Sequence, residues 1–190
     1  MIEKISNFLA VQIAEVLNEK EKINIFCYGF QIILNTLLSI SLVIIVGVLI
    51  EKPMHALFYL FSYCSIRLWA GGYHAASNAK CIFLFILFFI LSIVGAQIIV
   101  FDKIILWIFL ILENILLFWA APVGTPENPI PQPLLKGMKK KTIIASLMIT
   151  FLIILQKDKS MKMFGFFGFF WVVVLVLYGK FVEEGSLYEK

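Results

Sequence analysis

The residues that could carry out chemistry lie together between positions 67 and 81, where a histidine, a cysteine and the single arginine of the chain occur. A thiol and an imidazole within hydrogen-bond distance can act as a nucleophile and a general acid. His74 and Cys81 are seven residues apart. In one unbroken helix they would stand about 10 Å apart along the axis, whereas proton transfer needs about 3 Å. The pair therefore requires that His74 lie in a loop that folds back over the start of the Cys81 helix.

Gly71-Gly72 makes such a loop feasible, because glycine adopts positive φ angles readily and can end a helix. Ser77 or Asn78 can then cap a new helix. With Asn78 as the cap, Cys81 lies in the first helical turn, where the helix N-terminus favours the thiolate. A cysteine deep in an apolar span would instead stay inert. This segment, residues 67–81, is hereafter the central loop.

Two further charged residues are candidates for supporting roles. Arg67 stays charged and offers a planar fork of donors, so we predict that it holds a substrate carboxylate or a developing oxyanion. The alternative is an interfacial side chain that snorkels, a role that lysine would serve equally well. Glu113 interrupts an apolar run and needs a partner, either the central loop or an amide at Asn35 or Gln97.

The other reactive residue types are interpreted as structural. Three cysteines cannot all pair, and Cys27 and Cys64 are expected to behave as small apolar residues. His55 is expected at the far end of the second predicted span, away from the chemistry. Gly95 lies inside a span, where alanine is at least as good a helix former. Two nearby ligands fall short of a zinc site, so we expect neither a metal nor another cofactor.

The composition places this chemistry in a membrane. The chain is 62% hydrophobic and 15% charged, against about 45–50% and about 25% in soluble domains. The apolar residues fall in several long runs, which predicts an all-α, polytopic membrane protein. The net charge of +4 is modest, and no basic face with interleaved aromatic residues indicates nucleic acid.

We expect one integral membrane domain over residues 1–190. Residues 1–22 have apolar positions at helical spacing and predict an amphipathic helix on the membrane surface. Residues 25–178 should form a helical bundle, in which residues 122–141, rich in proline and lysine, make an extended cytoplasmic connector. The second and fifth of six expected spans are short and could be re-entrant. The six spans are 25–50, 54–68, 82–100, 104–121, 142–155 and 163–178.

The basic residues predict the orientation. With the N-terminus inside, eleven of the sixteen lysine and arginine residues fall on the inner side, as the positive-inside rule requires. Both termini, the central loop and residues 122–141 should therefore face the cytoplasm. Lys139 and Lys140 could dock an acidic peptide tail, although topology alone explains their presence.

The central loop also resembles a known signature. Arg67, the run Ala70-Gly71-Gly72-Tyr73-His74-Ala75 and Cys81 resemble the motif of the accessory gene regulator B (AgrB) family, membrane endopeptidases of Gram-positive quorum sensing. The resemblance extends over the whole chain, through its length, its amphipathic N-terminus, its several spans and the proline-rich segment that begins at Ala121-Pro122.

The resemblance implies that the chain cleaves the C-terminal part from a short AgrD-like precursor peptide at the cytoplasmic face of the plasma membrane. It implies Cys81 as the nucleophile and His74 as the general base and acid, with Arg67 and Gly72 as essential supporting residues. Gly71 and Asn78 are expected to support the same site. A cysteine or serine of the precursor would then attack the acyl-enzyme and close a thiolactone or lactone, provided that water is excluded.

Two alternative functions were weighed against the endopeptidase, and the sequence also predicts an assembly state. A non-catalytic peptide exporter or scaffold should show matching halves, which this chain lacks. A metal-dependent protease should show an HExxH motif, which is absent. Aromatic residues surround the 163–178 span, and Gly165 and Gly168 permit close helix approach. Together with the resemblance, they predict a homodimer with its own His74 and Cys81 in each protomer.

The predicted orientation can be tested with single-cysteine variants and a membrane-impermeant thiol reagent on intact cells. Probes at Lys103 and Asp158 should react from outside, and probes at Ser77 and Asn128 should react only after the membrane is permeabilised. Reaction at Asn128 in intact cells would show that the six-span arrangement with an inner N-terminus is wrong.

Overall fold

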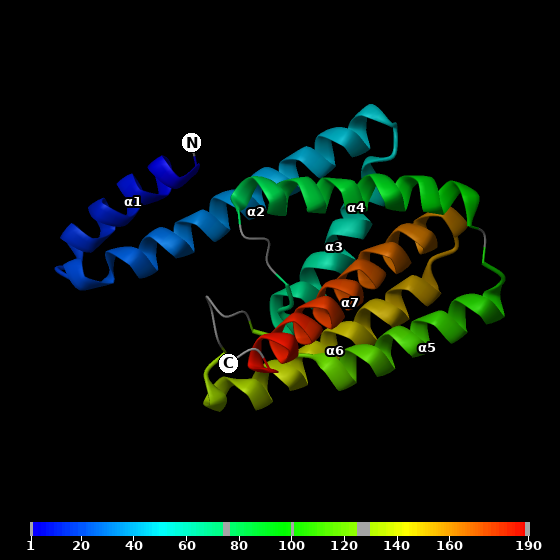
Figure 1. Cartoon of the computed structure of the whole chain (residues 1–190). Helices are drawn as coiled ribbons and strands as arrows, with labels where there is room; N and C mark the ends of the chain where they lie inside the picture. Colours follow the sequence, from blue (N-terminus) through cyan, green and yellow to red (C-terminus); the bar gives the residue numbers. More distant parts are fainter. Residues whose placement is uncertain (1, 74–76, 100, 125–129, 189–190) are drawn as a thin grey trace.

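The computed structural model describes residues 2–73, 77–99, 101–124 and 130–188, with side chains as far as residue 182. Within these residues the chain is helical and has no β-strand (Figure 1). The elements are α1 (Ile2–Val16), the 3-10 turn η1 (Lys20–Lys22), α2 (Ile23–Leu49), α3 (Pro53–Ala70), α4 (Asn78–Ile98), α5 (Lys103–Ala120), α6 (Gln132–Leu155) and α7 (Lys159–Tyr188). The predicted all-α class is confirmed, and so is an N-terminal helix, although it ends at Val16 and not at residue 22.

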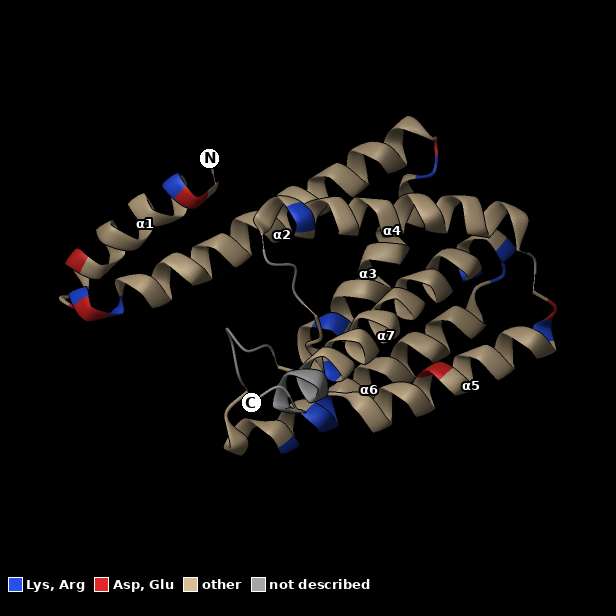
Figure 2. Cartoon of the chain, in the orientation of Figure 1, with Lys and Arg blue, Asp and Glu red and all other residues tan. Residues whose placement is uncertain are grey.

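Four segments of the described chain are long and apolar enough to cross a bilayer, which agrees with an all-α membrane protein. They are Lys20–Leu49, Asn78–Ile98, Lys103–Ala120 and Lys159–Val182. The second and fifth predicted spans correspond to α3 and α6, which are not among these four. Charged residues lie mostly at helix ends and in connections, with the middle of α5 as a visible exception (Figure 2). The number of six spans stays a prediction.

Helix α7 occupies the centre of the bundle and contacts α3, α4, α5 and α6 (Figure 1). Its aromatic residues Phe164, Phe166, Phe167 and Phe169 are buried against these neighbours. A Cβ built on Gly168 would stand 2.7 Å from the backbone oxygen of Tyr59 in α3. The aromatic faces and the close approach that suggested a dimer are therefore used inside one chain, and the homodimer stays a prediction without their support.

Helix α1 packs against α2, and the two form a hairpin that extends to one side of the bundle (Figure 1). The face of α1 that is buried consists of small residues, Ser6, Ala10 and Ala14, each fully buried. The apolar side chains of Phe8 and Val16 remain exposed on the other side. Because small residues make the helix contact, the apolar stripe stays free, as an interfacial helix requires.

Two expectations about individual segments are wrong. Helix α6 begins at Gln132, so residues 132–141 are helical and do not belong to an extended connector. Pro133 lies in the first turn, where its missing N–H costs no hydrogen bond, so the proline starts this helix. The helix that holds the predicted 163–178 span is longer than expected, because α7 runs from Lys159 to Tyr188. A Cβ built on Gly95 would stand 2.5 Å from the ring of Phe167 in α7, so an alanine there requires this ring to shift.

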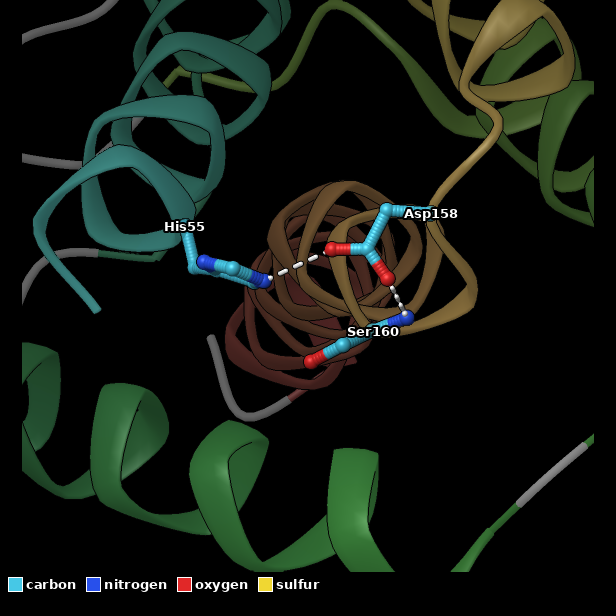
Figure 3. A network of polar contacts seen from close by, with 3 residues as sticks. All are labelled: His55, Asp158 and Ser160. Atoms are coloured by element: carbon cyan, nitrogen blue, oxygen red, sulfur yellow. Dashed lines mark hydrogen bonds and ion pairs between the residues drawn. The ribbon is translucent and has the colours of Figure 1, made fainter. Parts of the chain in front are cut away.

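His55 and Asp158 connect α3 to the start of α7 at the end of the bundle opposite to the central loop (Figure 3). His55 Nε2 lies 3.0 Å from Asp158 Oδ2, and Asp158 Oδ1 accepts a hydrogen bond from the Ser160 N–H at 3.0 Å. Desolvation raises the pKa of Asp158, but the hydrogen bonds from Ser160 and His55 outweigh it, and this pKa lies below its usual value. Asp158 thus caps α7 and anchors it to α3.

Replacing Asp158 by alanine should lower the free energy of unfolding by about 1 kcal/mol through loss of the cap. Asp158→Asn should cost less, because asparagine is also a good cap. Since folding lowers the pKa of Asp158, its contribution is present above the ordinary carboxyl range and is lost as pH falls through the lowered value. Thermal unfolding in detergent at several pH values measures both effects, and identical pH profiles for wild type and Asp158→Asn would contradict this account.

Candidate functional site

The break between α3 and the rest of the central loop is built from two glycines. Helix α3 ends at Ala70, and Gly71 and Gly72 follow with φ angles of 65° and 109°. A side chain at Gly71 would collide with the backbone oxygen of Val123, and one at Gly72 with the guanidinium group of Arg67. The predicted helix end at Gly71-Gly72 is confirmed, and both positions exclude a Cβ for steric as well as conformational reasons.

Backbone hydrogen bonds attach the central loop to two distant segments. Gly71 forms a parallel bridge with Val123, in which the Gly72 N–H donates to Val123 O at 2.9 Å and the Val123 N–H donates to Ala70 O at 3.0 Å. The Tyr73 N–H donates to Leu175 O of α7 at 3.0 Å. The loop is thus held by the chain that follows α5 and by α7.

Arg67 lies one turn before the end of α3 and folds over the loop that follows. Its guanidinium group donates hydrogen bonds to the backbone oxygens of Gly71, Gly72 and Tyr73. No carboxylate forms a salt bridge with it in the part of the chain that the structure describes. Arg67 is therefore neither bound to a carboxylate nor extended as a snorkelling side chain, and its first observed role is to organise the loop.

Cys81 lies in the first turn of α4, as predicted, but the cap of that helix is Ser77 and not Asn78. Ser77 has an extended backbone, with φ −143° and ψ 149°, and its Oγ accepts a hydrogen bond from the Lys80 N–H at 3.3 Å. Serine and asparagine are equally good caps, so composition alone left both open. Asn78 is instead the first helical residue, and its Oδ1 accepts a hydrogen bond from Asn35 Nδ2 of α2 at 2.6 Å.

Cys81 and Arg67 line one small cavity of about 30 Å³. Most of the wall is aromatic or aliphatic. The lining residues are Tyr63, Arg67, Tyr73, Cys81, Leu84, Phe85, Phe88 and Leu175. His74 lies outside the described residues; it follows Tyr73 directly in the sequence.

The remaining candidates are not brought to this cavity. Glu113 is 3% exposed on α5, and neither carboxyl oxygen has a hydrogen-bond partner among the described residues. The suggested pairing with Asn35 or Gln97 is therefore wrong, and Asn35 donates to Asn78 instead. Lys139 and Lys140 are exposed on α6 and do not line the cavity.

The structural residue types behave largely as expected. Cys27 and Cys64 are free thiols. Cys27 accepts a weak hydrogen bond from Gln31 at 3.6 Å, and Cys64 lies half-buried in α3. His55 lies near the start of α3, at the end away from Arg67.

Sequence reasoning missed three positions that support the site. The sequence predicted Asn35 only as a possible partner of Glu113, and its contact with Asn78 of α4 was missed. Val123 and Leu175 contribute backbone oxygens. Because every residue has such an oxygen, residue type could not indicate these positions.

Comparisons with known proteins find one matching family model and related sequences. A family model described as accessory gene regulator B matches residues 2–176. The chain is similar to an AgrB-like protein of Clostridium perfringens (strain SM101 / Type A), with 31% identity over 152 residues, covering 74% of this chain and 70% of the relative. It is similar at 32% identity, with the same coverage, to AgrB-like protein 2 of Clostridium perfringens (strain 13 / Type A). No solved structure matches the chain.

The Asn35–Asn78 hydrogen bond should be measurable as a coupling between α2 and α4. A double-mutant cycle of Asn35→Ala and Asn78→Ala in detergent should give a coupling of about 0.6 kcal/mol, with about 1.7 kcal/mol as an upper value for such bonds. Asn35→Ala combined with Asn114→Ala, which removes a separate bond from α5 to Thr150 of α6, should be additive. Additivity in the first cycle would contradict the contact.

Proposed function

The chain belongs to the accessory gene regulator B family, and we propose that it is a membrane-embedded cysteine endopeptidase that processes an AgrD-like autoinducer precursor for quorum sensing. One observation carries the proposal. Cys81 stands in the first turn of α4 at a small, mostly apolar cavity, with the guanidinium group of Arg67 on the same cavity and His74 next to the lining residue Tyr73.

The proposed reaction begins with proton transfer from the Cys81 thiol to His74. The apolar wall opposes ionisation of the thiol and the charge of Arg67 favours it, so a base is needed to take the proton. The sulfur attacks the precursor carbonyl, the C–N bond breaks, and His74 returns the proton to the leaving amine. The N-terminal part of the precursor is then held as a thioester on Cys81.

Ring closure is the second half of the proposal. A cysteine thiol or serine hydroxyl of the precursor gives its proton to His74 and attacks the thioester. The bond to Cys81 breaks as the thiolactone or lactone forms, and the Cys81 sulfur takes the proton back from His74. The exchange succeeds only if the internal nucleophile reaches the acyl group before water does. The small cavity with a mostly apolar wall supports this requirement, because such a wall offers water few hydrogen-bond partners.

The supporting residues would act through the shape of the loop. Arg67 satisfies three consecutive backbone oxygens and keeps a positive charge near the thiol. Gly71 and Gly72 let the chain pass between Val123 and Arg67. We assign all three to positioning the site, and Arg67 in addition to stabilising negative charge on the sulfur or on the tetrahedral intermediate.

We also propose that the lysine-rich start of α6 binds the rest of the precursor. Lys141 lies over the ring of Trp69 in α3 at 4.0 Å, which ties the first turns of α6 to the end of α3 that carries the central loop. Lys139 and Lys140 are exposed beside it and would attract an acidic tail of the precursor. The orientation with this end in the cytoplasm, the plasma membrane as location and the homodimer belong to the same proposal.

Replacing Cys81 by alanine or serine should lower precursor cleavage by more than about a thousandfold, as loss of a nucleophile does. The measurement is cleavage of a synthetic precursor by protein reconstituted in vesicles, with intact mass used to detect the thioester on wild-type enzyme. His74→Ala should also abolish cleavage.

The matched controls are the other two cysteines. Cys27→Ala and Cys64→Ala should keep activity close to that of wild type, because neither thiol lines the cavity. Cleavage by Cys81→Ala, or a mass adduct that persists in that variant, would remove Cys81 as the nucleophile.

A further inference from the structure

One turn of α7 contacts Tyr73 of the central loop through a hydrogen bond and through an aromatic ring. Leu175 O accepts a hydrogen bond from the Tyr73 N–H at 3.0 Å, and the Tyr73 ring meets the Tyr178 ring edge-on, with centroids 4.8 Å apart. Leu175 also lines the Cys81 cavity. The turn from Leu175 to Gly179, hereafter the docking turn, therefore shares a wall with the nucleophile.

Gly179 is the position at which the loop comes closest to α7. A Cβ built there would stand 2.7 Å from Tyr73 N, 3.2 Å from the carbonyl carbon of Gly72 and 3.3 Å from Val123 Cγ1. The two nearest atoms belong to the backbone, so no side-chain rotation can relieve the contact. An alanine at this position would have to push the loop away from α7.

Helix α7 does not itself require glycine at position 179. Gly179 lies inside α7, which continues to Tyr188, and glycine is a poorer helix former than alanine in a helix interior. Two other helical glycines, Gly29 in α2 and Gly137 in α6, have no atom within 4 Å of a built Cβ. The loop, and not the helix, therefore accounts for glycine at position 179.

We propose that Gly179 is a positioning residue for the reaction. Its missing side chain lets Gly72 and Tyr73 lie on the docking turn, and this holds Tyr73 in the wall of the Cys81 cavity, at the point from which the chain continues to His74. The proposal rests on the proposed function, since it assumes that His74 and Cys81 react together. According to this proposal, a residue of α7, about a hundred positions from the motif, determines the geometry of the site.

The test compares Gly179→Ala with Gly29→Ala and Gly137→Ala in the full-length protein in vesicles. Gly179→Ala should lower kcat by between about tenfold and a hundredfold, the range expected for a misplacement of about 1 Å, with KM nearly unchanged. The two controls should keep the wild-type kcat. Equal losses in all three variants would overturn the proposal, because the effect would then come from helix glycines in general.

Amide hydrogen exchange gives a readout that does not depend on activity. The N–H groups of Gly72 and Tyr73 should be protected in the wild type, since both are hydrogen-bonded, and should exchange faster in Gly179→Ala. Fast exchange in the wild type, or unchanged protection in Gly179→Ala, would overturn the docking. Absence of cleavage by wild-type protein would instead remove the proposed function while exchange still tests the docking.

A second pair of variants covers the case in which Gly179→Ala fails to fold. Tyr178 is half-exposed, so its replacement leaves the core intact. Tyr178→Ala removes the ring that supports Tyr73 and should lower kcat, whereas Tyr178→Phe keeps the ring and should restore it. A wild-type kcat in Tyr178→Ala, together with unchanged exchange at Tyr73, would also overturn the proposal.

Discussion

The structure of the central loop depends on satisfying the backbone oxygens at the end of α3 and in the residues that directly follow it. A helix end leaves several carbonyl groups without intrahelical partners, and in a membrane protein water is scarce, so protein groups must supply the donors. Arg67 donates to three successive oxygens, and Val123 N–H donates to a fourth, that of Ala70. The single arginine is thus placed where one side chain can serve several acceptors, which lysine, with its point charge, does less well.

The same requirement explains why the site is assembled from distant segments. Once the loop leaves α3, its own N–H groups need acceptors, and they find them on Val123 and on Leu175 of α7. These bonds are possible only where two backbones come close, which is why Gly71, Gly72 and Gly179 all lie at the contact. The central position of α7 gives the loop a rigid surface, since its aromatic side chains are packed against four other helices.

Sequence reasoning succeeded where a property belongs to a short run of residues. The helix end at Gly71-Gly72 and the first-turn position of Cys81 followed from local chemistry, and the apolar runs located the helices. It failed where two solutions were locally equivalent or where a partner was distant. Ser77 and Asn78 cap equally well, so the choice between them depended on the bond from Asn35. The close approach of Gly95 to the Phe167 ring could not be predicted, because the two residues are 72 positions apart in the chain.

The sequence by itself determined that this is an all-α membrane protein of the accessory gene regulator B family and that its thiol stands at the start of a helix. These properties depend on composition, local spacing and a contiguous motif. The tertiary structure alone decided that Arg67 binds backbone, that Glu113 lies away from the cavity and that α7 receives the loop. Those outcomes depend on backbone atoms and on helix approach, and neither is encoded in residue type, because every residue carries the same carbonyl group and its neighbours across a contact are set only when the helices pack.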